Sequence, residues 1–308
     1  MTIQQLEYIL AVDRYRHFAR AAEHCGVTQP TLSAMIQKLE DELGVKIFDR
    51  RIQPVIPTNI GEKIIEQAKQ IQAQVAQVKE IIYEEKHLVN GTFKLAVLPT
   101  IAPYLLPRFF PQLKDKYPGI DIRVIEKKTH EVIAGLLNEE FDAAIIASYP
   151  DSPHLSGEIL FYEEFLGYVS AKETIFKNEL IRTSDVSGTR LWLLDEGHCF
   201  RDQLMRFCQM ETVKSNQMTY QLGSLETFMR MVENGQGMTF IPELAALQLN
   251  DGQKKFVRPF AIPRPTRSIV LTTRKDYIRK SLLEVIKKEV QQSIPNEMLT
   301  LQVGQTLV

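Results

Sequence analysis

Apolar positions in residues 1–58 follow the spacing of short helices joined by tight turns. Residues 18–24 show a helical pattern, and Gly26 interrupts it. Thr28 then offers an N-cap hydroxyl for a second helix that runs to about Leu43. Two short helices separated by a tight turn predict a helix-turn-helix, a motif that places its second helix in the major groove of DNA.

The second of these helices has one apolar and one polar face. Leu32, Ile36 and Leu39 recur at helical spacing and are predicted to face a core. The opposite face is small, neutral and rich in hydrogen-bonding groups, which suits side chains that must reach base edges in a groove. The candidate DNA-binding residues of this helix and its first turn are Thr28, Gln29, Pro30, Thr31, Ser33 and Gln37.

Residues 45–51 and 55–58 have the pattern of a short hairpin beside these helices. Arg50 and Arg51 lie where a wing would meet the phosphate backbone and complete the candidate DNA contacts, although both could be ordinary solvated charges. Residues 1–58 hold seven basic and seven acidic side chains. This balance disfavours binding by phosphate neutralisation alone and favours a dimer that reads promoter DNA by shape and base contacts.

A long helical pattern follows, and residues 59–88 are predicted to form a linker helix. Its apolar positions alternate in steps of three and four, as in a coiled-coil seam: Ile60, Ile64, Ala68, Ile71, Val75, Val78 and Ile82. At 1.5 Å per residue the helix extends about 40 Å. We expect it to pair with a second copy, so that two helix-turn-helix units match a palindromic site; packing on the chain's own core is the alternative.

Beyond residue 90 the pattern changes to alternating strands and helices. Short apolar runs predict strands at residues 93–97, 120–124, 143–146, 166–169 and 269–271. Helical stretches are predicted at residues 103–116 and 129–138. This alternation indicates an α/β region with a mostly parallel sheet.

Length and composition narrow the class of protein. A chain of 308 residues is long enough for two or three domains, and 44% hydrophobic and 24% charged residues are typical of a globular protein. The net charge of -1 gives no global attraction to nucleic acid, so any contact with DNA must be local. No signal segment or run of about 20 apolar residues is evident, which predicts a cytoplasmic protein without membrane contact. The three cysteines lack CxxC spacing, so we expect no metal and no cofactor.

The sequence resembles the LysR-type transcriptional regulators over nearly its whole length. The similarity is carried by residues 18–22, 28–33, 38–40, 43–45, 117–120, 141–145 and 235–242. It implies a winged helix-turn-helix over residues 1–58, the linker helix, and a regulatory domain over residues 89–308 with two α/β lobes like those of periplasmic binding proteins. Lobe I would comprise residues 89–162 and 268–300, and lobe II residues 163–267. The resemblance also implies a DNA-binding regulator that is not an enzyme, a homotetramer built as a dimer of dimers, and RNA polymerase as a partner.

Within that family, residues 197–203 together with Cys208 resemble the redox segment of members that sense hydrogen peroxide. The resemblance implies a regulator of the oxidative stress response in which Cys199 attacks peroxide and Cys208 resolves the product into a disulfide. Because a thiol reacts as its thiolate, the site needs groups that favour negative charge and groups that hold the peroxide oxygens. The candidates for these roles are Thr100, Thr129, His130, His198, Asp202 and Arg267.

The spacing of the two cysteines bears on this mechanism. If residues 199–208 were helical, nine steps of about 100° would put the sulfurs on opposite faces, with a rise of about 13.5 Å. A disulfide needs Cα atoms within about 7 Å, so oxidation would remodel the segment. Three alternatives stay open: a regulator that binds a small metabolite between the lobes, a thiol peroxidase, and cysteines that are merely structural. Cys25, in the turn between the first helices, is expected to be a small buried hydrophobe.

Overall fold

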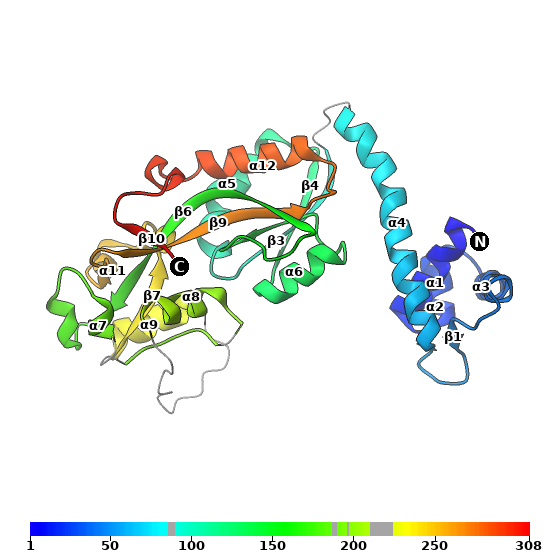
Figure 1. Ribbon diagram of the computed structural model, residues 1–308, viewed down its shortest axis with the longest axis horizontal. Coiled ribbons are helices and arrows are strands. Elements are labelled where there is room, and N and C mark those ends of the chain that lie inside the picture. Colours follow the sequence, from blue (N-terminus) through cyan, green and yellow to red (C-terminus); the bar gives the residue numbers. More distant parts are fainter. Residues whose placement is uncertain (86–89, 187–189, 196, 210–223) are drawn as a thin grey trace. The chain divides into compact units, whose positions relative to one another are not determined.

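The computed structural model describes residues 1–85, 90–186, 190–195, 197–209 and 224–308; in residues 73–85 it describes side chains only at positions 74, 75, 78 and 81. The chain forms two compact units, Met1–Lys86 and His87–Val308 (Figure 1). The predicted boundary between residues 88 and 89 lies outside the described residues. No helix of the described part is long and apolar enough to cross a membrane.

The first unit is helical and carries a small hairpin. Its elements are α1 (Ile3–Tyr15), α2 (Phe18–His24), α3 (Gln29–Leu43), β1 (Phe48–Asp49), β2 (Ile56–Pro57) and α4 (Asn59–Glu85). Strands β1 and β2 pair antiparallel, which forms the wing that the sequence predicts beside α2 and α3. The helix-turn-helix prediction is therefore confirmed, with bounds close to those expected.

Helix α3 begins and ends where its capping residues dictate. The side chain of Thr28 accepts a hydrogen bond from the backbone N–H of Thr31, and Pro30 lies in the first turn. Gly44 ends the helix at φ 68°, in the left-handed region that favours glycine. The predicted core positions Leu32, Ile36 and Leu39 are fully buried, so the opposite face is exposed.

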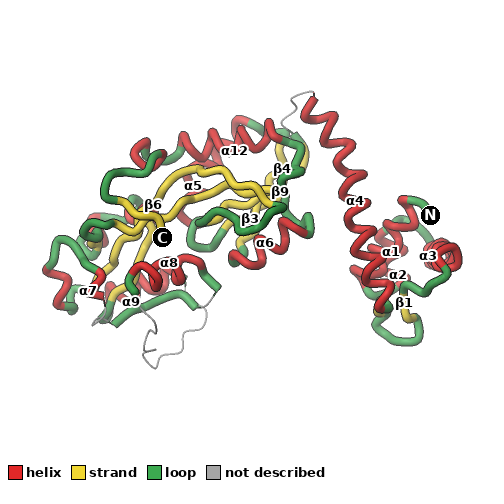
Figure 2. Tube along the Cα trace, viewed as in Figure 1, coloured by secondary structure: helices red, strands yellow, loops and turns green. Residues whose placement is uncertain are grey.

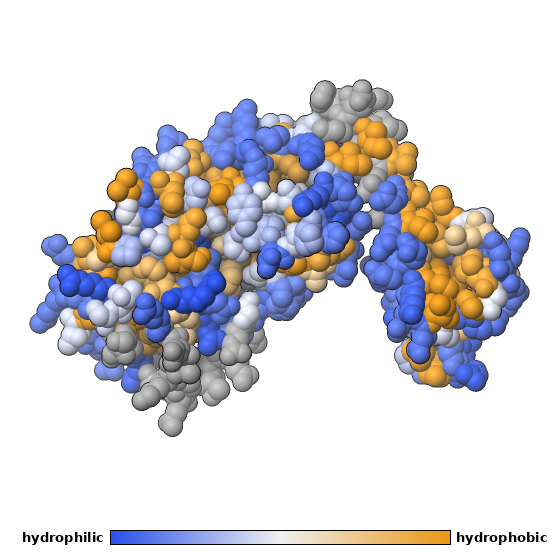
Figure 3. All heavy atoms as spheres, viewed as in Figure 1, coloured by the Kyte–Doolittle hydropathy of each residue, from blue (hydrophilic) through white to orange (hydrophobic). Residues whose placement is uncertain are grey.

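Helix α4 has two different halves. In its first half Ile65 and Ala68 are buried against the core of the first unit, and Ile64 and Ile71 pack partly against it. Farther along, Val75, Val78 and Ile81 are exposed. Figure 3 shows apolar atoms gathered along this helix. Of the predicted seam, Ile64, Ala68 and Ile71 pack against the core of the first unit, and Ile60, Val75 and Val78 are exposed. The side chain of Ile82 lies outside the described residues.

The second unit is built on one eight-stranded sheet (Figure 2). Its main path runs β4 (Ile120–Glu126), β3 (Gly91–Val97), β5 (Ala143–Ile146), β9 (Arg264–Arg274), β6 (Leu155–Val169) and β7 (Met238–Pro242). Strand β10 (Gln305–Leu307) pairs with β9, and β8 (Val257–Arg258) pairs with β6. The helices are α5 (Ala102–Lys116), α6 (Thr129–Leu137), α7 (Thr183–Val186), α8 (Cys199–Phe207), α9 (Leu225–Asn234), α10 (Glu243–Ala246), α11 (Asp251–Lys254) and α12 (Lys280–Gln292), with 3-10 turns at Thr174–Lys177 and Asn296–Leu299.

The prediction of a mostly parallel sheet is wrong. Strand β3 is parallel to β4 and β5, but β9 is antiparallel to β5 and β6, and β6 is antiparallel to β7 and β8. The reason is that β6 and β9 are long strands that pair with each other and run from one lobe into the other. Their shared register, which includes Glu163 opposite Arg267, ties the two lobes together.

Candidate functional site

The two predicted redox cysteines lie at opposite ends of helix α8. Cys199 is its first residue, after the N-cap His198, and Cys208 is its C-cap, where its backbone N–H donates to the carbonyl of Leu204 at 2.9 Å. Both are free thiols and partly buried. An unbroken helix over nine residues separates the two positions by a rise of about 13.5 Å, so the structure is that of a reduced protein with distant thiols.

The Cys208 thiol is partly buried in this state. Burial raises its pKa to about 11, so the sulfur is protonated near neutral pH. Cys25 behaves in a similar way, since burial and the nearby carboxylate of Glu7 raise its pKa as well. Both thiols are therefore disfavoured as thiolates, the form that acts as a nucleophile.

Polar contacts join Asp195 and His198, which precede α8, to Lys128 at the start of α6. Lys128 Nζ donates to Asp195 Oδ2 at 2.9 Å, and Asp195 Oδ1 lies 3.2 Å from His198 Nε2. Burial, together with the positive charge of Lys128, lowers the pKa of His198 below its usual value, against the opposing effect of Asp195. The imidazole beside Cys199 is therefore mainly neutral at pH 7.

Two more of the predicted residues, Thr129 and His130, adjoin this loop. A Cβ atom placed on Gly197 would lie 3.9 Å from the ring of His130 and 3.6 Å from the side chain of Lys128. Gly197 has φ +89°, so the backbone there needs glycine. The hydroxyl of Thr129 is buried and has no hydrogen-bond partner among the described residues. The structure thus brings residues 128–130 together with Asp195, Gly197 and His198.

The other predicted pair, Thr100 and Arg267, forms a second buried group. Arg267 is only 1% exposed, and its Nη1 donates to Thr100 Oγ1 at 3.1 Å while Nη2 donates to the Thr100 carbonyl at 3.0 Å. Its Nε and Nη2 both donate to Glu163 Oε2, at 2.9 and 2.7 Å. The guanidinium carbon also lies 5.0 Å from the ring centroid of Phe200, the neighbour of Cys199 in α8. Arg267 therefore reaches the cysteine helix through Phe200.

Helix α8 is anchored by two buried side chains. Phe200 packs against Phe165 of β6 with ring centroids 4.8 Å apart. The amide of Gln203 donates to the carbonyls of Ala147 and Val308, at 2.9 and 3.1 Å. These contacts join the helix to strand β6 and to the segments that contain Ala147 and Val308. The remaining predicted residue, Asp202, is exposed in the first turn of α8.

Four residues of this region were absent from the sequence prediction: Lys128, Glu163, Asp195 and Gln203. Asp195 and Gln203 lie within four residues of Cys199, and Lys128 precedes the predicted Thr129, so their position was a usable signal. Glu163 is 104 residues from Arg267, and only the pairing of β6 with β9 brings the two together.

The predicted DNA-binding residues of the first unit are mostly accessible. Thr28, Gln29, Pro30 and Thr31 are exposed at the start of α3, and Ser33 and Gln37 are partly exposed. Gln37 donates to Asp41 at 2.6 Å. Among the predicted DNA-binding residues of α3, those in its N-terminal turn are therefore the most exposed.

The two wing arginines differ. Arg50 donates to Ser33 Oγ at 3.1 Å and to Glu40 at 3.2 Å, and its guanidinium carbon lies 5.0 Å from the centre of the Phe18 ring. Arg51 is 89% exposed and is ion-paired with Asp49 at 2.8 Å. Arg50 thus braces the wing against α3, whereas the exposed Arg51 pairs with Asp49 within the wing.

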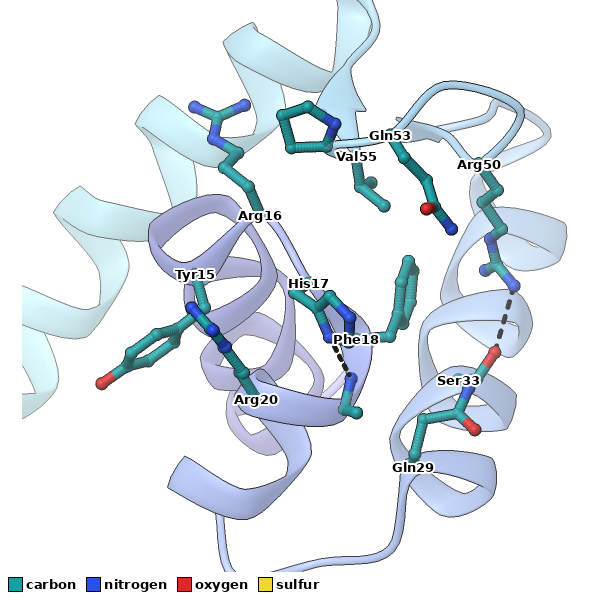
Figure 4. Close-up of a pocket in the computed structure, with 12 residues that line it drawn as sticks. Tyr15, Arg16, His17, Phe18, Arg20, Gln29, Ser33, Arg50, Gln53 and Val55 are labelled. Carbon is teal, nitrogen blue, oxygen red and sulfur yellow. Dashed lines mark hydrogen bonds between the residues drawn. The ribbon is translucent and has the colours of Figure 1, made fainter.

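A groove of about 760 Å³ lies between the start of α2, the start of α3 and the wing. Figure 4 shows Arg50 reaching across it to Ser33, with Gln29 one turn earlier on the same helix. Arg16, His17 and Arg20 also line this groove, and the sequence prediction did not select them. Because its basic side chains come from the turn before α2, from α2 and from the wing, the groove can follow a nucleic-acid backbone beside α3.

The described residues hold no group of three or more His, Cys, Asp or Glu side chains that could bind a metal ion.

Comparison with known proteins assigns both units. Residues 3–62 match the bacterial regulatory helix-turn-helix family of LysR type, and residues 86–294 match the LysR substrate binding domain. The chain therefore belongs to the LysR family of bacterial transcription regulators: it is a DNA-binding regulator and not an enzyme.

Similar proteins within the LysR family indicate which kind of regulator the chain is. The chain is 36% identical to the "Hydrogen peroxide-inducible genes activator" of Haemophilus influenzae, over 89% of this chain and 91% of that protein. It is 33% identical to the "DNA-binding transcriptional dual regulator OxyR" of Escherichia coli, over 94% and 95% of the two chains. It is an OxyR-type regulator.

The chain is also similar to solved structures of OxyR proteins. OxyR from Porphyromonas gingivalis is 52% identical with a TM-score of 0.67, over 71% of this chain and 99% of that one. A full-length OxyR variant from Pseudomonas aeruginosa is 34% identical with a TM-score of 0.75, over 96% and 99%. The second comparison covers both the DNA-binding and the regulatory units.

Proposed function

We propose that this protein senses hydrogen peroxide through Cys199, forms a Cys199–Cys208 disulfide, and thereby changes its binding to promoters of oxidative stress genes. The observation that carries the proposal is the position of the two free thiols at opposite ends of one intact helix. Such a helix cannot hold the disulfide, so the oxidised protein must have another shape. A covalent signal is converted in this way into a conformational one.

The chemistry has two balanced steps. The Cys199 thiolate attacks one oxygen of hydrogen peroxide, the O–O bond breaks, and a proton converts the departing hydroxide to water while the sulfur becomes a sulfenic acid. The Cys208 thiol then displaces hydroxide from that sulfur, which forms the disulfide and a second water. Because burial raises the pKa of Cys208 to about 11, we assign the first attack to Cys199 and the resolving role to Cys208.

Polar groups around the start of α8 fit these steps. Since Thr100 Oγ1 accepts from Arg267, its own O–H is free to donate to a peroxide oxygen. The four hydrogen bonds of Arg267 use four of its five N–H groups, which leaves one on Nη1 for the same oxygen. We assign peroxide binding to these groups and to the unpaired hydroxyl of Thr129.

Proton transfer is assigned to the groups on the other side of Cys199. His198 is mainly neutral near pH 7 because its pKa is lowered, so it can accept the thiol proton. Its contact with Asp195 stabilises the imidazolium that results. His130, next to Gly197, and Asp202, in the first turn of α8, are proposed as further proton carriers.

Remodelling of residues 199–208 would release the anchors of α8. Phe200 contacts both Arg267 of β9 and Phe165 of β6, so unwinding the helix changes the packing on the two strands that cross between the lobes. We propose that lobe I (residues 89–162 and 268–300) and lobe II (residues 163–267) shift at these strands. Small changes at such a crossing are a known route to rigid-body motion.

The readout is proposed to be promoter binding by a homodimer or homotetramer, with RNA polymerase as a further partner. The exposed apolar residues of α4 supply the pairing surface of the dimer. Two copies of α3 then place Thr28, Gln29 and Thr31 in successive major grooves of a palindromic site. Arg16 and Arg20, which line the adjoining groove, contact the DNA phosphates. We place this activity in the cytoplasm.

The decisive experiment is a promoter footprint of the wild type and of Cys199→Ser, with and without peroxide. We expect peroxide to change the protected region for the wild type and to leave that of Cys199→Ser unchanged. The Cys208→Ser variant should lose the lasting response. A wild-type footprint that peroxide does not alter, or a response that persists in Cys199→Ser, would instead favour a regulator controlled by a small metabolite.

A further inference from the structure

Glu163 neutralises the arginine at the centre of the regulatory domain. Its carboxylate is 2% exposed and Arg267 is 1% exposed, and both N–H donors that reach Glu163 Oε2 lie within 2.9 Å. The pair sits in register on β6 and β9, where the strands pass between the lobes. A buried pair of this kind costs free energy to desolvate, so stabilisation of the fold does not by itself account for it.

The other oxygen of Glu163 is also fixed. Oε1 accepts from the backbone N–H of Leu244 in α10 at 3.0 Å. The carboxylate is therefore held from α10 and holds Arg267 in turn, so neither group can rotate without breaking hydrogen bonds. With its Nε and Nη2 bound to Glu163, the guanidinium faces Thr100 with Nη1 and lies 5.0 Å from the ring centroid of Phe200.

We infer that Glu163 is a positioning residue for the reaction of Cys199 with peroxide. It orients Arg267 so that the remaining Nη1 N–H and the Thr100 hydroxyl form one donor pair beside the first turn of α8. This inference rests on the proposed function. Glu163 has two opposite effects on the reaction. It orients the donors of Arg267, which favours the reaction, but its carboxylate also cancels a positive charge that would otherwise stabilise a thiolate at Cys199.

These opposite effects make the role measurable in the Glu163→Gln variant. Gln keeps the size of the side chain and an oxygen for Leu244, but it removes the charge that fixes the guanidinium. Two rates at Cys199 are compared in full-length protein: oxidation by hydrogen peroxide, and alkylation by iodoacetamide as a function of pH. We expect peroxide oxidation to slow by at least about tenfold because an oriented donor pair is lost. The alkylation profile should move to lower pH, because the positive charge of Arg267 is no longer balanced.

Glu164→Gln is the matched control. Glu164 is the next residue and 8% exposed, but it pairs with Arg264 at 2.8 Å instead of Arg267. This substitution should leave both rates at Cys199 within about twofold of the wild type, because the Glu164 side chain bonds to Arg264 and Gln305 and not to Arg267. A slower peroxide reaction in both variants would assign the effect to general damage of the strand and would overturn the inference.

The remaining outcomes separate the inference from the function on which it rests. If peroxide does not oxidise Cys199 in the wild type, both are wrong. If the wild type reacts and Glu163→Gln reacts equally fast, or if its peroxide and alkylation rates fall in parallel, only the role of Glu163 is wrong. Should Glu163→Gln not fold, Glu163→Asp keeps the charge but withdraws it by one methylene. That variant should slow peroxide oxidation while its alkylation profile stays in place, and an unchanged rate would count against the inference.

Discussion

His198 illustrates how neighbouring charges set the state of one side chain. Burial and Lys128 lower its pKa, whereas Asp195 and Asp202 raise it, and the net direction is downward from 6.5. The imidazole therefore gains its proton at a lower pH in the folded chain than in the unfolded one. The stabilisation from the neutral form is present above about pH 6.5 and is lost as the pH falls through the folded-state pKa.

This argument predicts the effect of Lys128→Met. Removing the cation removes one cause of the depression, so the pKa of His198 should rise toward 6.5 or above it. NMR titration of the imidazole in wild type and variant measures the two midpoints directly. Lys127→Met is the control, because Lys127 pairs with Glu131 instead of Asp195. A wild-type midpoint above 6.5, or equal midpoints in Lys128→Met and wild type, would contradict the assignment.

The resemblance to peroxide-sensing regulators supplied candidate residues that are far apart in the sequence, such as Thr100 and Arg267, but it did not supply the buried partner of Arg267. Cys199 and Cys208 were selected because residues 197–203 together with Cys208 resemble the redox segment of those regulators, and His198 and Asp202 lie in the same segment. Glu163 carries no such signal, because an acidic residue in a strand is ordinarily a solvated one. Its burial depends on a guanidinium 104 residues away, which only the β6–β9 register supplies.

At the scale of the elements, strands β6 and β9 are both longer than the sequence predicted. Residues 166–169 were predicted as a strand, yet β6 spans Leu155–Val169. The polar residues Glu163 and Glu164 interrupt its apolar pattern, but both are buried by ion pairs with arginines of β9. Strand β9 was predicted only at residues 269–271 for the same reason. Helices with clear caps and periodicity, such as α3, were predicted almost in full.

Helix α8 depends on Gln203 for its attachment to the domain. The amide of Gln203 satisfies two backbone carbonyls, of Ala147 and Val308. Gln203→Ala leaves these acceptors without that donor, so we expect the free energy of unfolding to fall by about 1–3 kcal/mol. The loosened helix should also unwind more readily, so the Cys199–Cys208 disulfide should form faster after a limiting dose of peroxide.

Denaturant unfolding and mass spectrometry of quenched samples measure these two effects. Arg206→Ala is the control, since Arg206 is exposed on the same helix and bonds only to the carbonyl of Asp202 among the described residues. It should change the unfolding free energy by less than about 0.5 kcal/mol. A Gln203→Ala protein that is destabilised but forms the disulfide no faster would show that unwinding of α8 does not limit the second step.

For the whole molecule, the surface of α4 decides whether the helix-turn-helix acts in pairs. Within the predicted seam, Ala68 is buried against the chain's own core, whereas Val75 and Val78 are 39% and 60% exposed. An apolar stripe at coiled-coil spacing that the described residues leave exposed is typical of a surface that a second copy covers.

Val78→Glu tests this surface, because in a symmetric pair it would bring two carboxylates into the seam. We expect light scattering to show smaller assemblies and the affinity for a palindromic promoter to fall by about 100-fold or more, since two linked helix-turn-helix units bind far more tightly than one. Lys69→Gln makes the same change in net charge nine residues earlier, on the opposite face of the helix, and should leave both properties unchanged. If Val78→Glu kept the wild-type mass and affinity, the copies would have to associate elsewhere. The exposed half of α4 would then need another explanation.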